Sequence, residues 1–128
     1  MAYVKSFREL DVYILAKELT DEVFELTKAF PKEETYSLTD QIRRSSRSVG
    51  AQIAEAWGKR KYEKHFISKL TDADGEQLET QHWIEIAYDC GYISSEQKVD
   101  FLKKYELLGK RIATMISKSH LFCKKHTQ

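Results

Sequence analysis

Residues 37–58 read SLTDQIRRSSRSVGAQIAEAWG, and the architecture of the whole chain can be worked out from this segment. Its apolar residues recur at spacings of three and four, which is the period of a helix with one buried face: Leu38, Ile42, Val49, Ile53, Ala56 and Trp57. Arg43, Arg44 and Arg47 fall on the other side of this helix. Ser37, with Asp40 in the first turn, is predicted to cap its start. The pattern therefore predicts an amphipathic helix that packs against other helices.

Three further segments have the same helical period, over about residues 6–30, 62–90 and 95–122. Few helix breakers separate them, because the chain has only 5 Gly and 1 Pro. Ser94 and Gln97 have the spacing of a capping box at the start of the last segment. Short connections between long helices favour antiparallel neighbours. We therefore predict a single all-α domain over residues 1–128, an antiparallel up-down-up-down four-helix bundle with helices at about 6–30, 37–58, 62–90 and 95–122.

The composition is that of a globular domain. The chain has 128 residues, of which 41% are hydrophobic and 32% charged, and this balance excludes an intrinsically disordered protein. No apolar run approaches the roughly 20 residues of a membrane span, and the first residues lack the long apolar segment of a secretory signal. We therefore expect a cytoplasmic protein without a membrane partner. Cys90 and Cys123 are expected to be buried, reduced thiols at distant helix ends rather than a disulfide.

Charge is divided unevenly between the four segments, although the formal net charge is only +1. Residues 6–30 hold 3 basic and 6 acidic residues, a balance of −3, and residues 62–90 hold 2 and 7, a balance of −5. Residues 37–61 hold 6 basic and 2 acidic residues, a balance of +4, and residues 103–125 hold 7 and 1, a balance of +6. The second and fourth helices are therefore predicted to be basic, and the first and third acidic.

Two interpretations of this charge pattern stay open. In the first, acidic and basic helices lie beside one another and neutralise each other as surface ion pairs. In the second, the outward cations of the second and fourth helices bind phosphates, because arginine suits bidentate phosphate contact and aligned cations release counterions on binding. This second interpretation nominates nine residues for nucleic-acid binding: Arg43, Arg44, Arg47, Lys59, Arg60, Lys103, Lys110, Arg111 and Lys118.

No motif in the chain predicts an enzyme. Glu79 and His82 have the Glu-x-x-His spacing of di-iron bundles, but such a site needs a second copy, which this sequence lacks. His82 also lies off the apolar stripe of its helix. The sequence has no glycine-rich phosphate loop, and no His or Asp is placed by sequence to activate the serines at positions 45, 46 and 48. We therefore predict no catalytic residue, no metal and no cofactor.

Glu76 and Glu79 are predicted to have a structural role. The apolar stripe of the third helix runs around them, and a carboxylate in such a stripe needs a partner because an unpaired buried charge is costly. The expected partners are Arg43, Arg44 or Arg47, from the same chain or from a neighbouring subunit.

Two blocks of the sequence together resemble a known protein family. The first is QIRRSSRSV at residues 41–49, running on to IAE at 53–55, and the second is ADGE at 73–76, followed by Glu79, Ala87 and GYI at 91–93. They are similar to the small four-helix-bundle family first noticed as products of intervening sequences inside bacterial 23S rRNA genes. The resemblance covers about residues 7–121. It implies a homo-oligomer, since ring-shaped pentamers are known in the family, and distant kinship with the accessory proteins of diversity-generating retroelements, which assist a reverse transcriptase and bind nucleic acid through a basic surface.

These observations lead to two main functional hypotheses. The first is a non-enzymatic oligomer, expected to be a pentamer, that binds RNA or another nucleic acid through the basic faces of its second and fourth helices. The second is a protein–protein scaffold or accessory subunit whose ring assembly is the function, with the cations paired to acids across subunit contacts. A third hypothesis, a metalloenzyme, would require metal ligands beyond the single Glu-x-x-His pair.

Overall fold

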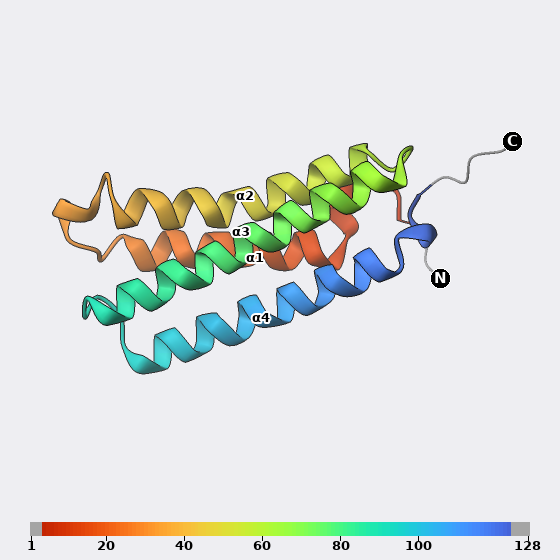
Figure 1. Ribbon diagram of the computed structural model, residues 1–128. Helices are drawn as coiled ribbons and strands as arrows, with labels where there is room; N and C mark the ends of the chain where they lie inside the picture. Colours follow the sequence, from red (N-terminus) through yellow and green to blue (C-terminus); the bar gives the residue numbers. More distant parts are fainter. Residues whose placement is uncertain (1–3, 124–128) are drawn as a thin grey trace, which may run out of the picture.

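Four long helices lie side by side in the computed structural model, which describes residues 4–123 (Figure 1). They are α1 (Asp11–Thr27), α2 (Leu38–Gly58), α3 (Glu63–Asp89) and α4 (Ser95–Ser117). Three single-turn 3-10 helices accompany them: η1 (Phe7–Glu9), η2 (Lys32–Glu34) and η3 (Ser119–Leu121). No strand occurs in the described chain, so the prediction of an all-α four-helix bundle is confirmed. The ends of the predicted domain, residues 1–3 and 124–128, lie outside the described residues.

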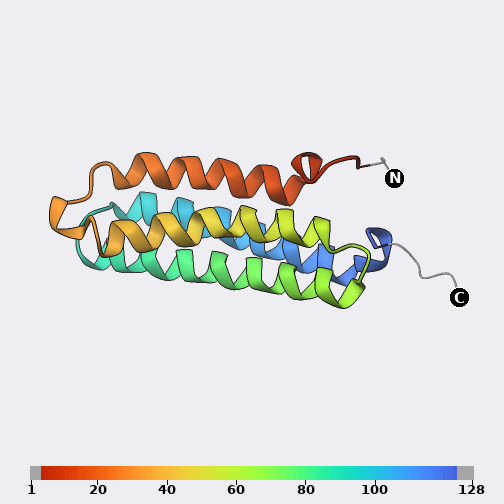
Figure 2. The same ribbon diagram turned by 90° about the horizontal axis from the view of Figure 1, so that it is seen from above.

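The two basic helices occupy opposite sides of the bundle. α2 packs against α1 and α3, and α4 packs mainly against α3 and less extensively against α1. Figure 1 accordingly shows α2 and α4 on opposite flanks with α1 and α3 between them, and in Figure 2, seen from above, α2 lies in front of α4. α1 and α2 are antiparallel. Thr20 of α1 donates a hydrogen bond to the carbonyl of Ser46, whereas Thr27, later in α1, accepts one from Arg43, earlier in α2.

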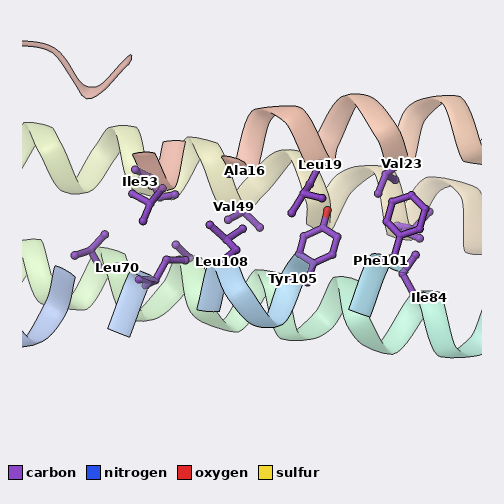
Figure 3. Close-up of a cluster of buried hydrophobic side chains, with 14 of the residues drawn as sticks. Ala16, Leu19, Val23, Val49, Ile53, Leu70, Ile84, Phe101, Tyr105 and Leu108 are labelled. Carbon is purple, nitrogen blue, oxygen red and sulfur yellow. The ribbon is translucent and has the colours of Figure 1, made fainter. Parts of the chain in front are cut away.

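The interior is an apolar core to which every helix contributes. Figure 3 shows Leu19, Val49, Leu70 and Leu108, one from each helix, converging on it, and all four are fully buried. Burying each such side chain stabilises the fold by about 1.5–3 kcal/mol. Tyr105 is equally buried, but its hydroxyl has no hydrogen-bond partner among the described residues. Burial in these apolar surroundings raises the pKa of Tyr105.

A buried polar contact links α2 to α3 within this core. The hydroxyl oxygens of Ser45 and Thr80 lie 2.8 Å apart, and both residues are completely buried. The Thr80 hydroxyl also donates to the backbone carbonyl of Glu76 at 2.9 Å. Leaving a buried hydroxyl without a partner costs about 1–3 kcal/mol, so this pair favours a single register between the two helices.

The helix boundaries differ from the predicted ones at both ends of the first helix. The predicted helix over residues 6–30 is a 3-10 turn followed by α1, because Leu10 has an extended backbone with ψ of 132°. The hydroxyl of Ser6 accepts the backbone N–H of Arg8 and stabilises that separate turn. At the other end α1 stops at Thr27, three residues before the position disfavoured by Pro31.

Helix capping was predicted correctly for one helix and wrongly for another. Ser94 and Gln97 form the predicted capping box at the start of α4. Ser37 precedes α2, but its side chain makes no capping hydrogen bond. The carboxylate of Glu34 accepts the backbone N–H of Leu38 at 3.3 Å instead, so an acid from η2 caps α2. The last helix also ends earlier than predicted, at Ser117.

The turn between α3 and α4 is tied to η2 at the same end of the bundle. Tyr92 donates a hydrogen bond of 2.8 Å to Glu34, and its ring lies 5.5 Å from that of Phe30. The hydrogen bond to the carboxylate raises the pKa of Tyr92 to about 12. Gly91 makes the reversal possible, because its φ of 79° is in the left-handed region that glycine adopts readily.

Both cysteines are free thiols, but they are not buried as expected. Cys90 is exposed because it follows α3 at this turn, and Cys123 is half-buried beyond η3. The C-terminal end of α3 and η3 lie at opposite ends of the bundle (Figure 1), which agrees with the absence of a bond between these two thiols.

Two helical glycines allow a test of how closely α3 and α4 pack. Nothing lies within 4 Å of the position that a Cβ would take at Gly75, so Gly75→Ala should stabilise the fold by about 0.5–1 kcal/mol. A Cβ at Gly109 would stand 2.7 Å from Nε2 of the buried Gln77, whose amide donates to Asp74. Gly109→Ala should therefore gain clearly less, or lose stability. Urea unfolding followed by circular dichroism measures both, and an equal gain for the two variants would contradict the close contact at Gly109.

Candidate nucleic-acid interface

Three arginines of α2 line a shallow groove on the outer face of the helix. Arg43, Arg44 and Arg47 are gathered there by helical spacing, because residues three and four apart lie on the same side. The groove has a volume of about 510 Å³, and its other lining residues are Thr35, Thr39, Asp40, Ser48 and Ala51. We call this surface the arginine groove. Three guanidinium groups against one carboxylate make it cationic.

Phe24 of α1 orients two of these arginines. The guanidinium carbon of Arg43 lies 4.6 Å from the centre of the Phe24 ring, and that of Arg47 lies 5.8 Å from it. Arg43 also donates from Nε to the hydroxyl of Thr27 at 2.7 Å. Within the described chain neither arginine forms an ion pair with a carboxylate. Both therefore keep terminal N–H groups for an external anion.

Arg44, in contrast, has a carboxylate partner. Its Nη2 lies 3.4 Å from Oε2 of Glu79, and the same nitrogen donates to Gln41 at 2.9 Å. Glu79 Oε2 also accepts the indole N–H of Trp83 at 3.0 Å. The Arg44 and Glu79 side chains are 57% and 35% exposed, so water screens this pair.

The other predicted ion pair is absent from the described structure. The carboxylate of Glu76 accepts a 2.9 Å hydrogen bond from the hydroxyl of Ser48, and no arginine pairs with it. Glu76 therefore has no arginine partner within the described chain, and an arginine partner from a neighbouring subunit stays a prediction. Ser48 faces α3 from the neighbouring turn of α2, and its short side chain reaches Glu76 where the arginines point outward.

The cations of α4 fall into two groups. Arg111 lies 3.8 Å from Asp11, and Lys104, which was not nominated, contacts Glu22 at 2.8 Å and Asp100 at 3.0 Å. Hydrogen bonds to Glu22 and then Asp100 raise the pKa of Lys104. The remaining nominated lysines are exposed and make no ion pair with any described residue: Lys103, Lys110 and Lys118.

The last two nominated residues lie just beyond the end of α2. Lys59 is exposed, and the guanidinium of Arg60 lies 3.5 Å from the centre of the Trp57 ring. We call residues 57–65, where α2 turns into α3, the α2–α3 corner. The helical rise places this corner roughly 20 Å from the arginine groove. The nine nominated residues therefore form three separate groups, at the arginine groove, the α2–α3 corner and the α4 flank, rather than one continuous face.

Sequence reasoning missed the aromatic residues beside these cations. Phe24 lies off the apolar stripe of α1, and Tyr36, next to Thr35 of the arginine groove, is 95% exposed. Trp57 and Tyr62 flank the basic run of the α2–α3 corner. Phe24, Tyr36 and Tyr62 each lie outside the predicted apolar stripes and within four residues of a lysine along the chain, which was the available signal, whereas Trp57 was assigned to the stripe of α2.

The described chain offers no metal or membrane-spanning element. Residues 4–123 contain no group of three or more His, Cys, Asp or Glu side chains that could hold a metal ion. Over the same residues, none of the helices has the length and apolar character needed to cross a membrane. His82 is exposed, and its ring lies 4.8 Å from that of Trp83.

The chain is thus a small four-helix-bundle protein with cationic groups on two opposite flanks. The chain matches the profile of the 23S rRNA-intervening sequence protein family over residues 8–114, and it belongs to that family. It is also similar to a crystal structure of a protein of unknown function from the S23 ribosomal protein family of Bacteroides thetaiotaomicron. The TM-score is 0.75 and the identity 29%, and the match covers 83% of this chain and 95% of that one. Among curated proteins none matches the chain significantly.

The exposure of the Arg44–Glu79 pair generates a prediction about its strength. A double-mutant cycle with Arg44→Ala and Glu79→Ala should give a coupling free energy of about 0.2–1 kcal/mol, and the coupling should fall with added salt. Urea unfolding of the four proteins measures it. A coupling above about 3 kcal/mol, the range of buried pairs, would show that Arg44 is committed to Glu79 and is unavailable to a ligand.

Proposed function

We propose that this protein is a non-enzymatic, cytoplasmic homo-oligomer that binds RNA or another nucleic acid through the cationic outer surfaces of α2 and α4. The observation that carries the proposal is the arginine groove, in which Arg43 and Arg47 are oriented by Phe24 and have no carboxylate partner in the described chain.

The chemistry of the arginine groove suits a phosphate backbone. Guanidinium groups bind phosphate oxygens with two parallel hydrogen bonds. The contact with Phe24 already restricts the side chains of Arg43 and Arg47, so they lose less conformational entropy when they bind a phosphate. Thr39 also lines the groove, whereas the hydroxyls of Thr35 and Ser48 already donate to the carbonyl of Lys32 and to the carboxylate of Glu76. Arg44 can exchange its screened contact with Glu79 for a phosphate at small cost.

The α4 flank contributes in a different way. Lys103, Lys110 and Lys118 are exposed ammonium groups without an aromatic support, so they act as point charges that attract a polyanion without orienting it. Because α4 lies opposite α2, one subunit presents two separate cationic flanks (Figure 1). In a homo-oligomer, for which the family resemblance implies a pentamer, each flank is repeated and the avidity for a long nucleic acid rises.

A scaffold or accessory subunit whose ring assembly is the function is the second candidate. The observation that favours it is a set of large apolar side chains on the outer faces of the helices, with Ile14, Leu78 and Leu107 each more than 40% exposed. Such side chains are suited to subunit contacts. In this alternative the cations pair with acids of neighbouring subunits and not with phosphates.

The two candidates differ in what the arginine groove does, and a salt titration separates them. We expect the wild-type protein to bind labelled RNA with log Kobs falling linearly as log salt rises. Arg43→Ala/Arg47→Ala should reduce the magnitude of that slope by about one to two, because two phosphate contacts are lost. Lys17→Ala/Lys32→Ala, which removes two exposed cations outside the nominated surfaces, is the matched control and should change the slope little. Fluorescence anisotropy measures the affinities.

Sedimentation velocity of the same variants supplies the second readout. Nucleic-acid binding predicts that Arg43→Ala/Arg47→Ala keeps the assembly state of the wild type while losing affinity for RNA. A groove variant that falls apart into smaller species would favour the scaffold. No binding by the wild type at about 50 mM salt, or an affinity indifferent to salt, would overturn the proposal.

A further inference from the structure

We infer that the α2–α3 corner is a stacking site for the unpaired bases of single-stranded nucleic acid, separate from the arginine groove. The inference rests on the proposed nucleic-acid binding and adds which form of nucleic acid the protein engages. Three kinds of observation carry it: the flat groups exposed at the corner, the unpaired cations around them, and the direction in which the one acid at the corner points.

The first flat group is a guanidinium supported by an indole. Trp57 packs against the core, and Arg60 covers it with its guanidinium carbon 3.5 Å from the ring centre. Arg60 Nε donates to the backbone carbonyl of Trp57 at 2.8 Å, which fixes the plane of the guanidinium. Its terminal nitrogens make no hydrogen bond or ion pair with the described residues. A guanidinium held in this way is a preformed surface on which a base can stack.

Two aromatic rings lie within five residues of this guanidinium along the chain. Tyr62, which precedes α3, is 49% exposed, and its ring centre lies 5.5 Å from that of the exposed His65. Lys61 places its ammonium 5.8 Å from the Tyr62 ring centre. Arg60, Tyr62 and His65 thus bring three planar groups into nine residues of chain, interleaved with cations. Base stacking on aromatic rings combined with cationic contacts to the backbone is typical of single-strand binding.

The cations of the corner are not neutralised by its carboxylate. Lys59, Lys61 and Lys64 are exposed and form no ion pair in the described part of the chain. The carboxylate of Glu63 accepts a hydrogen bond from the hydroxyl of Ser119 in η3, so it is directed toward the C-terminal end of α4. The positive charge of this corner therefore remains available to a phosphate backbone.

The geometry favours a single strand over a duplex. In a duplex the base faces are already stacked on one another, so planar protein groups contact only the grooves and the backbone. In a single strand the base faces are open and gain stacking energy from Arg60 and His65. An anionic membrane surface would meet the lysines but would give the guanidinium–indole stack no planar partner.

The test removes the planar guanidinium of Arg60 and keeps its positive charge. Arg60→Lys keeps the cation and removes the plane, and it should weaken binding to a single-stranded RNA oligonucleotide about tenfold while leaving a duplex of the same length within about twofold. Arg8→Lys is the matched control, because Arg8 also lies over an aromatic ring, 4.4 Å from the centre of Phe7, but outside the corner. It should bind both nucleic acids as the wild type does. Circular dichroism of each variant verifies the fold.

Tryptophan fluorescence gives a direct readout of contact at the corner. In a Trp83→Phe background Trp57 is the remaining indole of the chain, which has 2 Trp. Its emission should be quenched by the single strand and unchanged by the duplex. Equal affinity of the wild type and Arg60→Lys for the single strand would overturn the stacking site while leaving the proposed function intact, and a shift of Trp57 emission with phosphatidylserine vesicles but not with RNA would replace it with a membrane contact. Failure of the wild type to bind any nucleic acid would instead overturn the proposed function.

Discussion

Burial of the apolar stripe of α2 between α1 and α3 is the constraint on which the rest of the structure depends. Ile42, Val49 and Ile53 are completely buried, and together they remove enough apolar surface from water to stabilise the fold by about 5–9 kcal/mol. Once these positions face the core, the helical period leaves Arg43, Arg44 and Arg47 no place except the outer surface. The hydrogen bond between Ser45 and Thr80 reinforces the same orientation. The packing that stabilises the bundle therefore also presents its arginines to solvent.

The charge segregation of the chain has a similar structural consequence. Acidic α1 and α3 lie between basic α2 and α4, so many cations have a carboxylate on a neighbouring helix (Figure 1). Only some of these cations form an ion pair with such a carboxylate. Lys104 and Arg111 on α4 meet acids of α1, but Arg43 and Arg47 meet an aromatic ring instead. Partial neutralisation explains how a protein with a net charge of +1 retains localised cationic surfaces.

Much of the fold could be predicted from the sequence, because hydrophobic period, rare breakers and short connections all point to one arrangement. The α4 capping box was also predictable, since it depends on residues three positions apart. The cap of α2 was not, because Glu34 reaches Leu38 from a separate 3-10 turn whose geometry depends on packing. The partners of Glu76 and Arg43 were missed for a related reason. Which of several side chains reaches across a helix pair depends on the register and on side-chain length, and Ser48 and Phe24 fit where an ion pair was expected.

In the proposed function the cations on the outside of α2 hold a nucleic acid, and the protein assembles independently of it. Native mass spectrometry of the protein purified from cells tests this most directly, because one spectrum reports both the number of subunits and any retained polyanion. We expect an oligomer carrying nuclease-sensitive RNA or DNA mass, and the same oligomer without that mass once Arg43 and Arg47 are replaced by alanine. An oligomer that is free of nucleic acid with both arginines in place would contradict it.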